Sequence, residues 1–286
     1  METPYSEIFS PALSLILLVA VLFNPIIADG VPNIHYDPDN DGLSQTEEQL
    51  IEEKVEGAEP NSSKKDIIIE IDYHKGEKPS SEVIKTVEEV FESAPVENPD
   101  GTNGFNVHIL VDESFSGNGA MSFNTYEDEY YPNLYDYGGR GAYHVLLVEE
   151  VEPSEPGVIG VAGAYTDGTI VDGSMHDEKV AQIIIHELGH QLGLSSNDYT
   201  GIDSDAKTYD EYPSIMNYNG FGEDKNLSSG EGFDDWEHIE NSLPFTAPST
   251  SILTSGAVSI GEVLKIHRRC RIFRLFITIT LKTWEH

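Results

Sequence analysis

The sequence VAQIIIHELGHQLG occupies residues 180–193 and places His186, Glu187 and His190 within one apolar stretch. If the stretch is helical, the two histidines lie one turn apart on the same side, so both imidazoles can reach a single metal ion. Histidine nitrogens are common ligands in tetrahedral zinc sites. Glu187 projects from the same side of the helix. It is therefore the candidate general base, able to take a proton from a metal-activated water.

The residues around this pentapeptide predict that the helix forms. Ile184 and Leu188 recur at helical spacing, and the neighbouring isoleucines widen the stripe into a buried face. Ser174 and Asp177 offer side-chain oxygens that could cap the N-terminus. Gly193 stands where a residue with left-handed backbone conformation would end the helix.

A different interpretation of the pentapeptide remains open at this point. Short motifs of this kind also arise by chance. Two buried histidines whose ring nitrogens bond to backbone carbonyls would give the same five residues without any metal ion. The downstream sequence changes the balance in favour of a metal site.

Four residues and a downstream segment together resemble a known family: His186, Glu187, His190, Gly193 and the sequence Ser-Ile-Met-Asn-Tyr at 214–218. They are similar to the metzincin clan of zinc endopeptidases, whose long motif HExxHxxGxx(H or D) precedes a methionine-containing turn. The likeness extends over residues 64–243. It implies that Met216 packs beneath the metal ion and that Tyr218 stabilises the oxyanion formed during peptide hydrolysis. Ordinary core packing is the alternative use of Met216.

The third metal ligand is where this sequence departs from the metzincin pattern. The motif places that ligand at Ser196, and serine is a poor zinc ligand. We expect Asp198 to replace it through a slightly longer turn. Asp203 and Asp205 on the same loop, and the more distant His238, are further candidates. Acidic side chains on a solvated surface are the alternative reading of this loop.

The segments before the helix predict a β-α-β beginning followed by further strands. We expect strands at 66–73, 105–111 and 143–148, and an amphipathic helix at 80–94. The metzincin resemblance implies an α+β, zincin-like fold. Such a fold has a twisted mixed β-sheet with a backing helix, an active-site helix and a loop-rich C-terminal subdomain. Residues 157–164 resemble the clan's substrate-binding edge strand, although a glycine-rich loop fits their composition equally well.

A second metal signal lies at residues 37–48, which read DPDNDGLSQTEE. The spacing matches a calcium loop, with glycine at the sharp turn and oxygen ligands at the key positions. The expected ligands are Asp37, Asp39, Asp41, the Leu43 carbonyl and Glu48. The segment resembles the loops of EF-hands and of calcium-repeat linkers in surface proteins. Because only one copy occurs, we expect calcium to stiffen a linker; an acidic linker without metal is the alternative.

The N-terminal sequence predicts export from the cytoplasm. Residues 12–28 are apolar apart from a break at Asn24 and Pro25, and the stretch is short for a membrane span. A cleaved signal peptide is therefore favoured over a retained membrane anchor. The rest of the chain would then be extracellular, either secreted or anchored to the outer face of the cell membrane. The single Cys270 excludes an internal disulfide framework.

The chain is extremely acidic, with 51 acidic against 16 basic residues and a formal net charge of −35. This charge argues against a nucleic-acid partner. The composition resembles that of proteins from salt-loving archaea, in which salt screens the repulsion between surface acids. We therefore expect the fold to require high salt.

Four regions are expected along the chain: a signal peptide or anchor at 1–29, an acidic linker with the calcium loop at 30–63, a zinc metallopeptidase domain at 64–245, and a Ser/Thr linker with a basic, apolar tail at 246–286. The expected function is extracellular, zinc-dependent cleavage of peptide or protein substrates. The alternative is a calcium-binding adhesion or interaction module whose peptidase site has decayed through loss of its third ligand.

Overall fold

The computed structural model describes residues 36–137, 141–152, 158–163, 168–220, 226–230, 232–246 and 248. The chain divides into two units, 1–252 and 253–286, and every element described below belongs to the first. The apolar segment at 12–28 and the tail at 265–286 lie outside the described residues. Within the described part, the structure contains no helix with the length and apolar character needed to cross a membrane.

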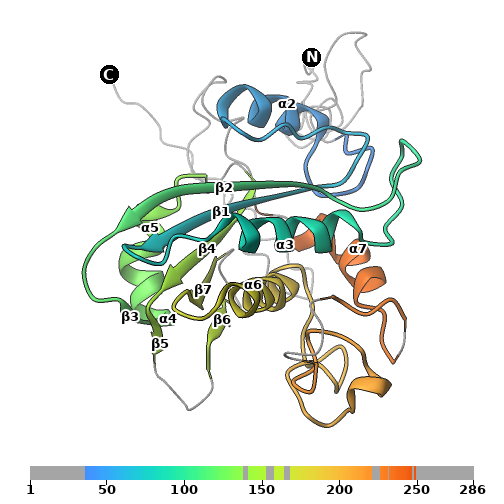
Figure 1. Ribbon diagram of the computed structural model, residues 1–286. Coiled ribbons are helices and arrows are strands. Elements are labelled where there is room, and N and C mark those ends of the chain that lie inside the picture. The colour runs from blue at the N-terminus through green and yellow to red at the C-terminus, as the bar shows by residue number, and fades with distance from the viewer. Residues whose placement is uncertain are drawn as a thin grey trace, which may run out of the picture. The chain divides into compact units, whose positions relative to one another are not determined.

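A five-stranded mixed β-sheet forms the centre of the fold (Figure 1). Its strands lie in the order β2 (Asn106–Phe115), β1 (Asp66–His74), β4 (Ala142–Val148), β7 (Gly168–Asp172) and β6 (Gly160–Ala162). The first four are parallel, and β6 pairs antiparallel with β7 at one edge. The predicted α+β class is thereby confirmed, as are the three strands expected from sequence.

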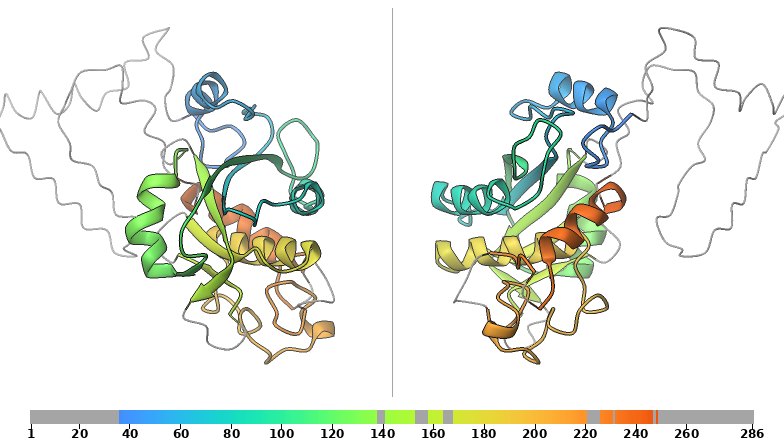
Figure 2. Two further views of the ribbon diagram at one scale, coloured as in Figure 1. Left: turned by 60° about the vertical axis from the view of Figure 1, so that its left-hand side comes forward. Right: turned by 90° about the vertical axis from the view of Figure 1, so that its right-hand side faces the viewer.

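The two faces of the sheet are covered by different helices because side chains alternate along each strand. One face packs against α3 (Ser81–Glu92) and α6 (Asp177–Gln191) through the odd-numbered isoleucines of β1. The opposite face packs against the helical segment at 123–134, and Figure 2 shows the two groups of helices on either side. The helix expected at 80–94 is α3, which connects β1 to β2.

The remaining elements are short or peripheral: β3 (Ala120–Ser122), α4 (Phe123–Thr125), η1 (Tyr126–Tyr130), α5 (Tyr131–Leu134), β5 (Glu150–Glu152), η2 (Tyr209–Glu211) and α7 (Asp235–Thr246). Between α6 and α7 the chain consists mainly of loops, which lie below α6 in Figure 1. This loop region supplies the residues that face the two histidines.

The described part of the expected linker at 30–63 packs against the sheet. It contains helix α2 (Gln45–Lys54), whose Ile51 is fully buried. Ile51 and Leu43 form an apolar cluster with Ile68 of β1 and Ala142 of β4. The packing follows from apolar residues on one side of α2 that find apolar partners on the sheet. The loop at 37–48 and the sheet therefore belong to one folded unit.

A buried polar chain crosses the core on the face that carries the segment 123–134. The Tyr126 hydroxyl lies 2.7 Å from His144 Nδ1, and His144 Nε2 lies 2.9 Å from an Asp72 carboxylate oxygen. All three side chains are essentially inaccessible to solvent. Since the Asp72 carboxylate accepts from Nε2–H, the Tyr126 hydroxyl donates to Nδ1.

The Tyr126→Phe variant tests the value of this chain of hydrogen bonds. It should lower the free energy of unfolding by about 1–3 kcal/mol, because a buried ring nitrogen loses its donor. Urea denaturation measures the change. Tyr130→Phe, which removes a partly exposed hydroxyl from the same helical segment, should change stability by less than about 0.5 kcal/mol. Equal losses in the two variants would contradict the account.

Candidate metal centre

Helix α6 carries His186, Glu187 and His190, as the sequence predicts, but its N-terminal cap differs from the prediction. The cap is His176, whose Nδ1 accepts a hydrogen bond from the Lys179 N–H. Ser174 instead donates to the Asp172 carboxylate, and Asp177 is the first residue inside the helix. The predicted caps were wrong because Ser174 is bonded to Asp172, two residues earlier, and the Asp177 carboxylate accepts a hydrogen bond from the Ser80 hydroxyl.

The C-terminus of α6 ends in a hydrogen-bonded turn that also holds His190. The Leu194 N–H donates to the Gly189 carbonyl and the Gly193 N–H donates to the His190 carbonyl, each at 3.0 Å. Gly193 has φ of +107°, so the predicted left-handed residue is confirmed. This turn brings the Leu194 carbonyl to 2.8 Å from His190 Nδ1. Helix termination thus fixes the orientation of the imidazole.

His186 is held in the same way by a different loop. Its Nδ1 lies 2.9 Å from the Ile215 carbonyl oxygen. A carbonyl only accepts hydrogen bonds, so Nδ1 of both histidines must carry the hydrogen. The Nε2 atoms are then left with their lone pairs directed away from the carbonyls. Metal-binding histidines are commonly oriented by such a bond from the nitrogen that does not bind the metal.

Asp203 completes a triangle of three donor atoms. One of its carboxylate oxygens lies 3.2 Å from each Nε2, and the two Nε2 atoms are 3.2 Å apart. With zinc–ligand bonds of 2.0–2.1 Å and tetrahedral angles, neighbouring ligands are about 3.3–3.4 Å apart. The three atoms therefore fit one face of a zinc coordination tetrahedron. The fourth position would be open.

The structure does not bring Asp198, the expected third ligand, to the histidines. Its carboxylate accepts a hydrogen bond from Ser195 at 2.6 Å and lies 3.8 Å from His238 Nε2. Asp205 is also absent from the group, as is His238. The prediction of Asp198 was wrong because the loop continues five residues further before it returns to α6.

Backbone hydrogen bonds explain why Asp203 is the residue that returns. Its N–H donates to the Met216 carbonyl, and the Tyr218 N–H donates to the Ser204 carbonyl. These bonds hold the loop alongside residues 214–218. Asp203 has φ of +51°, an uncommon conformation for a residue with a side chain. Such strain is typical of functional positions that the surrounding structure holds in place.

The charges within the triangle support one another. Burial alone would raise the pKa of Asp203, but its hydrogen bonds to both histidines lower it well below the usual value. Burial alone would lower the pKa of His190, yet the Asp203 carboxylate raises it to about 9. The site thus favours a carboxylate together with a positive charge, carried by a proton or by a metal ion.

Glu187 is buried beside the triangle and faces the edge strand β6. Burial raises its pKa, while the two histidines and the Ala162 N–H act in the opposite direction. A β-carbon added at Gly160 would lie 2.5 Å from a Glu187 carboxylate oxygen. Only glycine therefore lets the strand pass so close to this carboxylate. No pattern in the sequence indicates this role of Gly160.

Met216 is fully buried against α6. Its position explains why a glycine, which destabilises a helix interior, stands at residue 189. A β-carbon at Gly189 would come within 2.7 Å of the Met216 sulfur. Met216 is held by its N–H, which donates to the Ser214 hydroxyl oxygen. Met216 therefore packs against the histidine helix, and the missing side chain at Gly189 is what admits the sulfur.

Asp235, at the start of α7, anchors this turn and was missed by the sequence reasoning. It is fully buried and accepts hydrogen bonds from the Ser214 hydroxyl, the Tyr212 hydroxyl and the Ser228 N–H. In a chain with 51 acidic residues, nothing in the sequence distinguishes this one.

Tyr218 lies next to the triangle and is the accessible member of the group. The residue is 54% exposed, and its ring stacks beside that of His186 with ring centroids 6.4 Å apart. Burial of the hydroxyl and the nearby carboxylates of Asp203 and Glu187 raise its pKa. The phenol therefore stays protonated and able to donate a hydrogen bond at neutral pH.

Comparison with known proteins adds no relative to this picture. Neither protein-family models nor the curated proteins gave a match to this chain.

Replacing Gly160 by alanine should displace the Glu187 carboxylate without disturbing the triangle. For the zinc-dependent peptide hydrolysis that the sequence predicts, we expect the rate to fall by about 10-fold or more, since a base moved by an ångström loses its alignment. The zinc content should stay at that of the parent. Gly119→Ala is the matched control, because the added carbon would also displace a glutamate carboxylate, that of Glu149, which does not belong to the triangle. Loss of zinc in Gly160→Ala would contradict the assignment.

Proposed function

We propose that this chain is an extracellular zinc-dependent endopeptidase of the metzincin type. The observation that carries the proposal is the triangle of two Nε2 atoms and one carboxylate oxygen at 3.2 Å, with the buried Glu187 beside it. His186, His190 and Asp203 would hold the zinc ion. The mixed sheet, the histidine helix and the buried Met216 agree with the zincin-like arrangement that the sequence resemblance implies.

The proposed chemistry assigns one task to each polar group. A zinc ion held by these residues would supply a Lewis acid, which makes water more acidic and polarises a peptide carbonyl. Glu187 takes a proton from the attacking water and passes it to the leaving amine. Tyr218 donates a hydrogen bond to the oxygen of the carbonyl, which becomes negatively charged during the attack. As the third ligand, the Asp203 carboxylate would offset one of the two positive charges of the zinc ion.

Strand β6 supports an extended peptide as the substrate. It is the last strand in the sheet order and borders Glu187 through Gly160. An edge strand of this kind can pair with an added peptide strand through main-chain hydrogen bonds. The observed strand, Gly160–Ala162, falls inside the range 157–164 expected from the sequence.

The alternative, a decayed calcium-binding adhesion or interaction module, loses its main argument. That argument was the serine at the expected third ligand position, and Asp203 supplies a carboxylate from further along the loop. The buried Glu187 also favours an enzyme, because a purely structural zinc site needs no base.

Glu187→Gln is the direct test of catalysis. We expect kcat/KM for peptide hydrolysis to fall by about 10²–10⁴-fold, since the general base is lost while the metal ligands are kept. Zinc content should remain about one per chain. Glu178→Gln, an exposed glutamate on the same helix, is the matched control and should keep parental activity. A parent with bound zinc but no hydrolysis of any peptide in a broad library would favour the module instead.

A further inference from the structure

A second group of acidic side chains converges at the beginning of β1. Asp39, Asp41, Glu48 and Asp66 each offer an oxygen, and these oxygens lie within 4.8 Å of one another. All four residues are at most 4% exposed. Three come from the loop 37–48 and the start of α2. Asp66 is the first residue of the strand and was not among the ligands expected from sequence.

The loop is folded so that its carboxylates point inward. Gly42 has φ of +93°, as the sharp turn at this position requires. Asp37 lies outside the group, and its carboxylate accepts hydrogen bonds from the N–H groups of Asn40 and Gly42. Asp41 accepts from the Leu43 N–H. The backbone is thus organised by hydrogen bonds before any ligand is considered.

Several oxygens of the group lack a hydrogen-bond donor although they are buried. They are both carboxylate oxygens of Asp39 and one of Glu48. Buried polar atoms in native proteins almost always have a partner, and an unpaired buried carboxylate is especially costly. The arrangement therefore calls for a cation among these oxygens.

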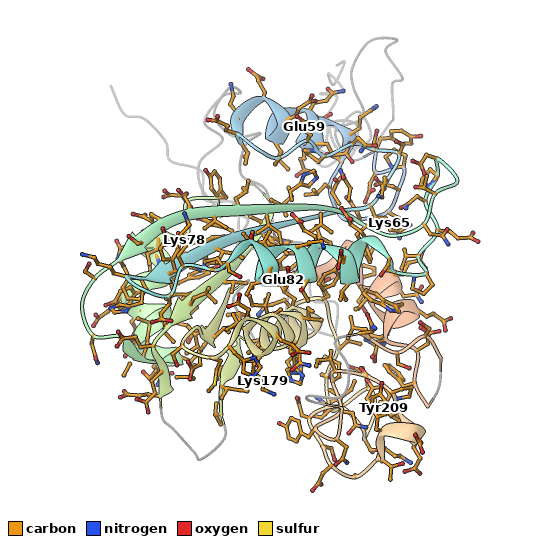
Figure 3. All side chains as sticks on the ribbon, in the orientation of Figure 1. Glu59, Lys65, Lys78, Glu82, Lys179 and Tyr209 are labelled. Carbon is orange, nitrogen blue, oxygen red and sulfur yellow. The ribbon has the colours of Figure 1, made fainter. Side chains whose placement is uncertain are left out.

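No lysine or arginine of the described residues forms an ion pair with the group. Lys65, labelled in Figure 3, is adjacent to Asp66 in the chain, but its ammonium donates to the Glu97 carbonyl and pairs with Glu240. His108 contacts Asp66, and its Nδ1 accepts from the Glu59 N–H. Its Nε2–H therefore donates to Asp66, and a neutral ring suffices for both bonds.

We propose that Asp66 completes a calcium site with Asp39, Asp41 and Glu48, and that calcium at this site fastens α2 to the central sheet. Calcium prefers six to eight oxygen ligands at 2.3–2.6 Å, so opposite ligands lie about 5 Å apart. The four oxygens match this spacing and are all hard donors. The proposal is independent of the zinc site and of peptide hydrolysis.

The hydrogen bonds of Asp66 connect the site to both the loop 37–48 and the central sheet. The Asp66 N–H donates to Asp41 at 2.9 Å, which ties the loop to β1. The Asp66 carboxylate also accepts from Asn106 and His108 of β2. Hydrogen-bond donors of this kind fix the orientation of a carboxylate that binds a metal ion. The apolar contact of α2 with Ile68 lies next to the site, so repulsion among the carboxylates opposes this packing until a cation is bound.

Calcium titration of the full chain tests the proposal, with thermal unfolding and calcium affinity measured together in multimolar KCl. Calcium at about one hundred times its Kd should raise the Tm of the parent by about 5–10 °C over the EGTA-treated protein. Asp66→Asn should weaken calcium binding by at least about 10-fold, as should Glu48→Gln. Glu52→Gln, an exposed residue one turn further along α2, is the matched control and should bind calcium like the parent.

Amide hydrogen exchange of the parent, measured with and without calcium, tests the proposal even if a variant fails to fold. Calcium should slow amide exchange in α2 and in the first half of β1 as well as in the loop 37–48. Three results would overturn the proposal: an unchanged Tm of the parent, parental calcium affinity in Asp66→Asn, or protection confined to the loop. The last two would mean that the loop binds the ion without the strand.

Discussion

Two imidazole Nε2 atoms and a carboxylate oxygen meet at 3.2 Å, and such electron-rich atoms repel one another unless a proton or a metal ion lies between them. In a neutral ring the single N–H hydrogen is on Nδ1, where it is donated to a backbone carbonyl, so it does not lie between the Nε2 atoms and the carboxylate. The alternative interpretation of the pentapeptide, two core histidines bonded to backbone carbonyls, therefore explains only the Nδ1 atom of each ring. The close contacts of the Nε2 atoms require a proton or a metal ion.

The scaffold around this triangle is built to keep the three atoms together. The turn after α6 fixes His190, and the turn at 214–217 fixes His186 and supports Met216. Asp203 is tied by its backbone to that second turn. The turn at 214–217 is held by the buried Asp235 of α7, which accepts a hydrogen bond from the Ser214 hydroxyl. Loop segments distant in sequence thus become rigid through hydrogen bonds, which is what a preorganised metal site needs.

Local periodicity was sufficient to predict the histidine helix, the three main strands and the helix between β1 and β2. The strands match short apolar runs, and the helices match apolar residues at a period of 3.6. The left-handed conformation of Gly193 was predictable because glycine is the usual residue at this position after a helix.

Residues that depend on long-range contacts were not predictable. Asp203 was one of several acids on an irregular loop, and loop length has no periodic signal. Asp66 reads as the start of a strand, and only the folded chain brings it to the loop 37–48. Gly160 matters because of a side chain that approaches it from another element. Sequence patterns describe neighbours along the chain, whereas these roles arise from neighbours in space.

The zinc content of the full-length protein, measured by elemental analysis after purification in multimolar salt, tests the central claim most directly. The account predicts about one zinc per chain in the parent and in Asp198→Ala, and loss of that zinc in Asp203→Ala. The two variants remove the same group from the same loop, so they differ only in the carboxylate that meets the histidines. A folded parent without zinc, or zinc lost in Asp198→Ala and kept in Asp203→Ala, would contradict the account.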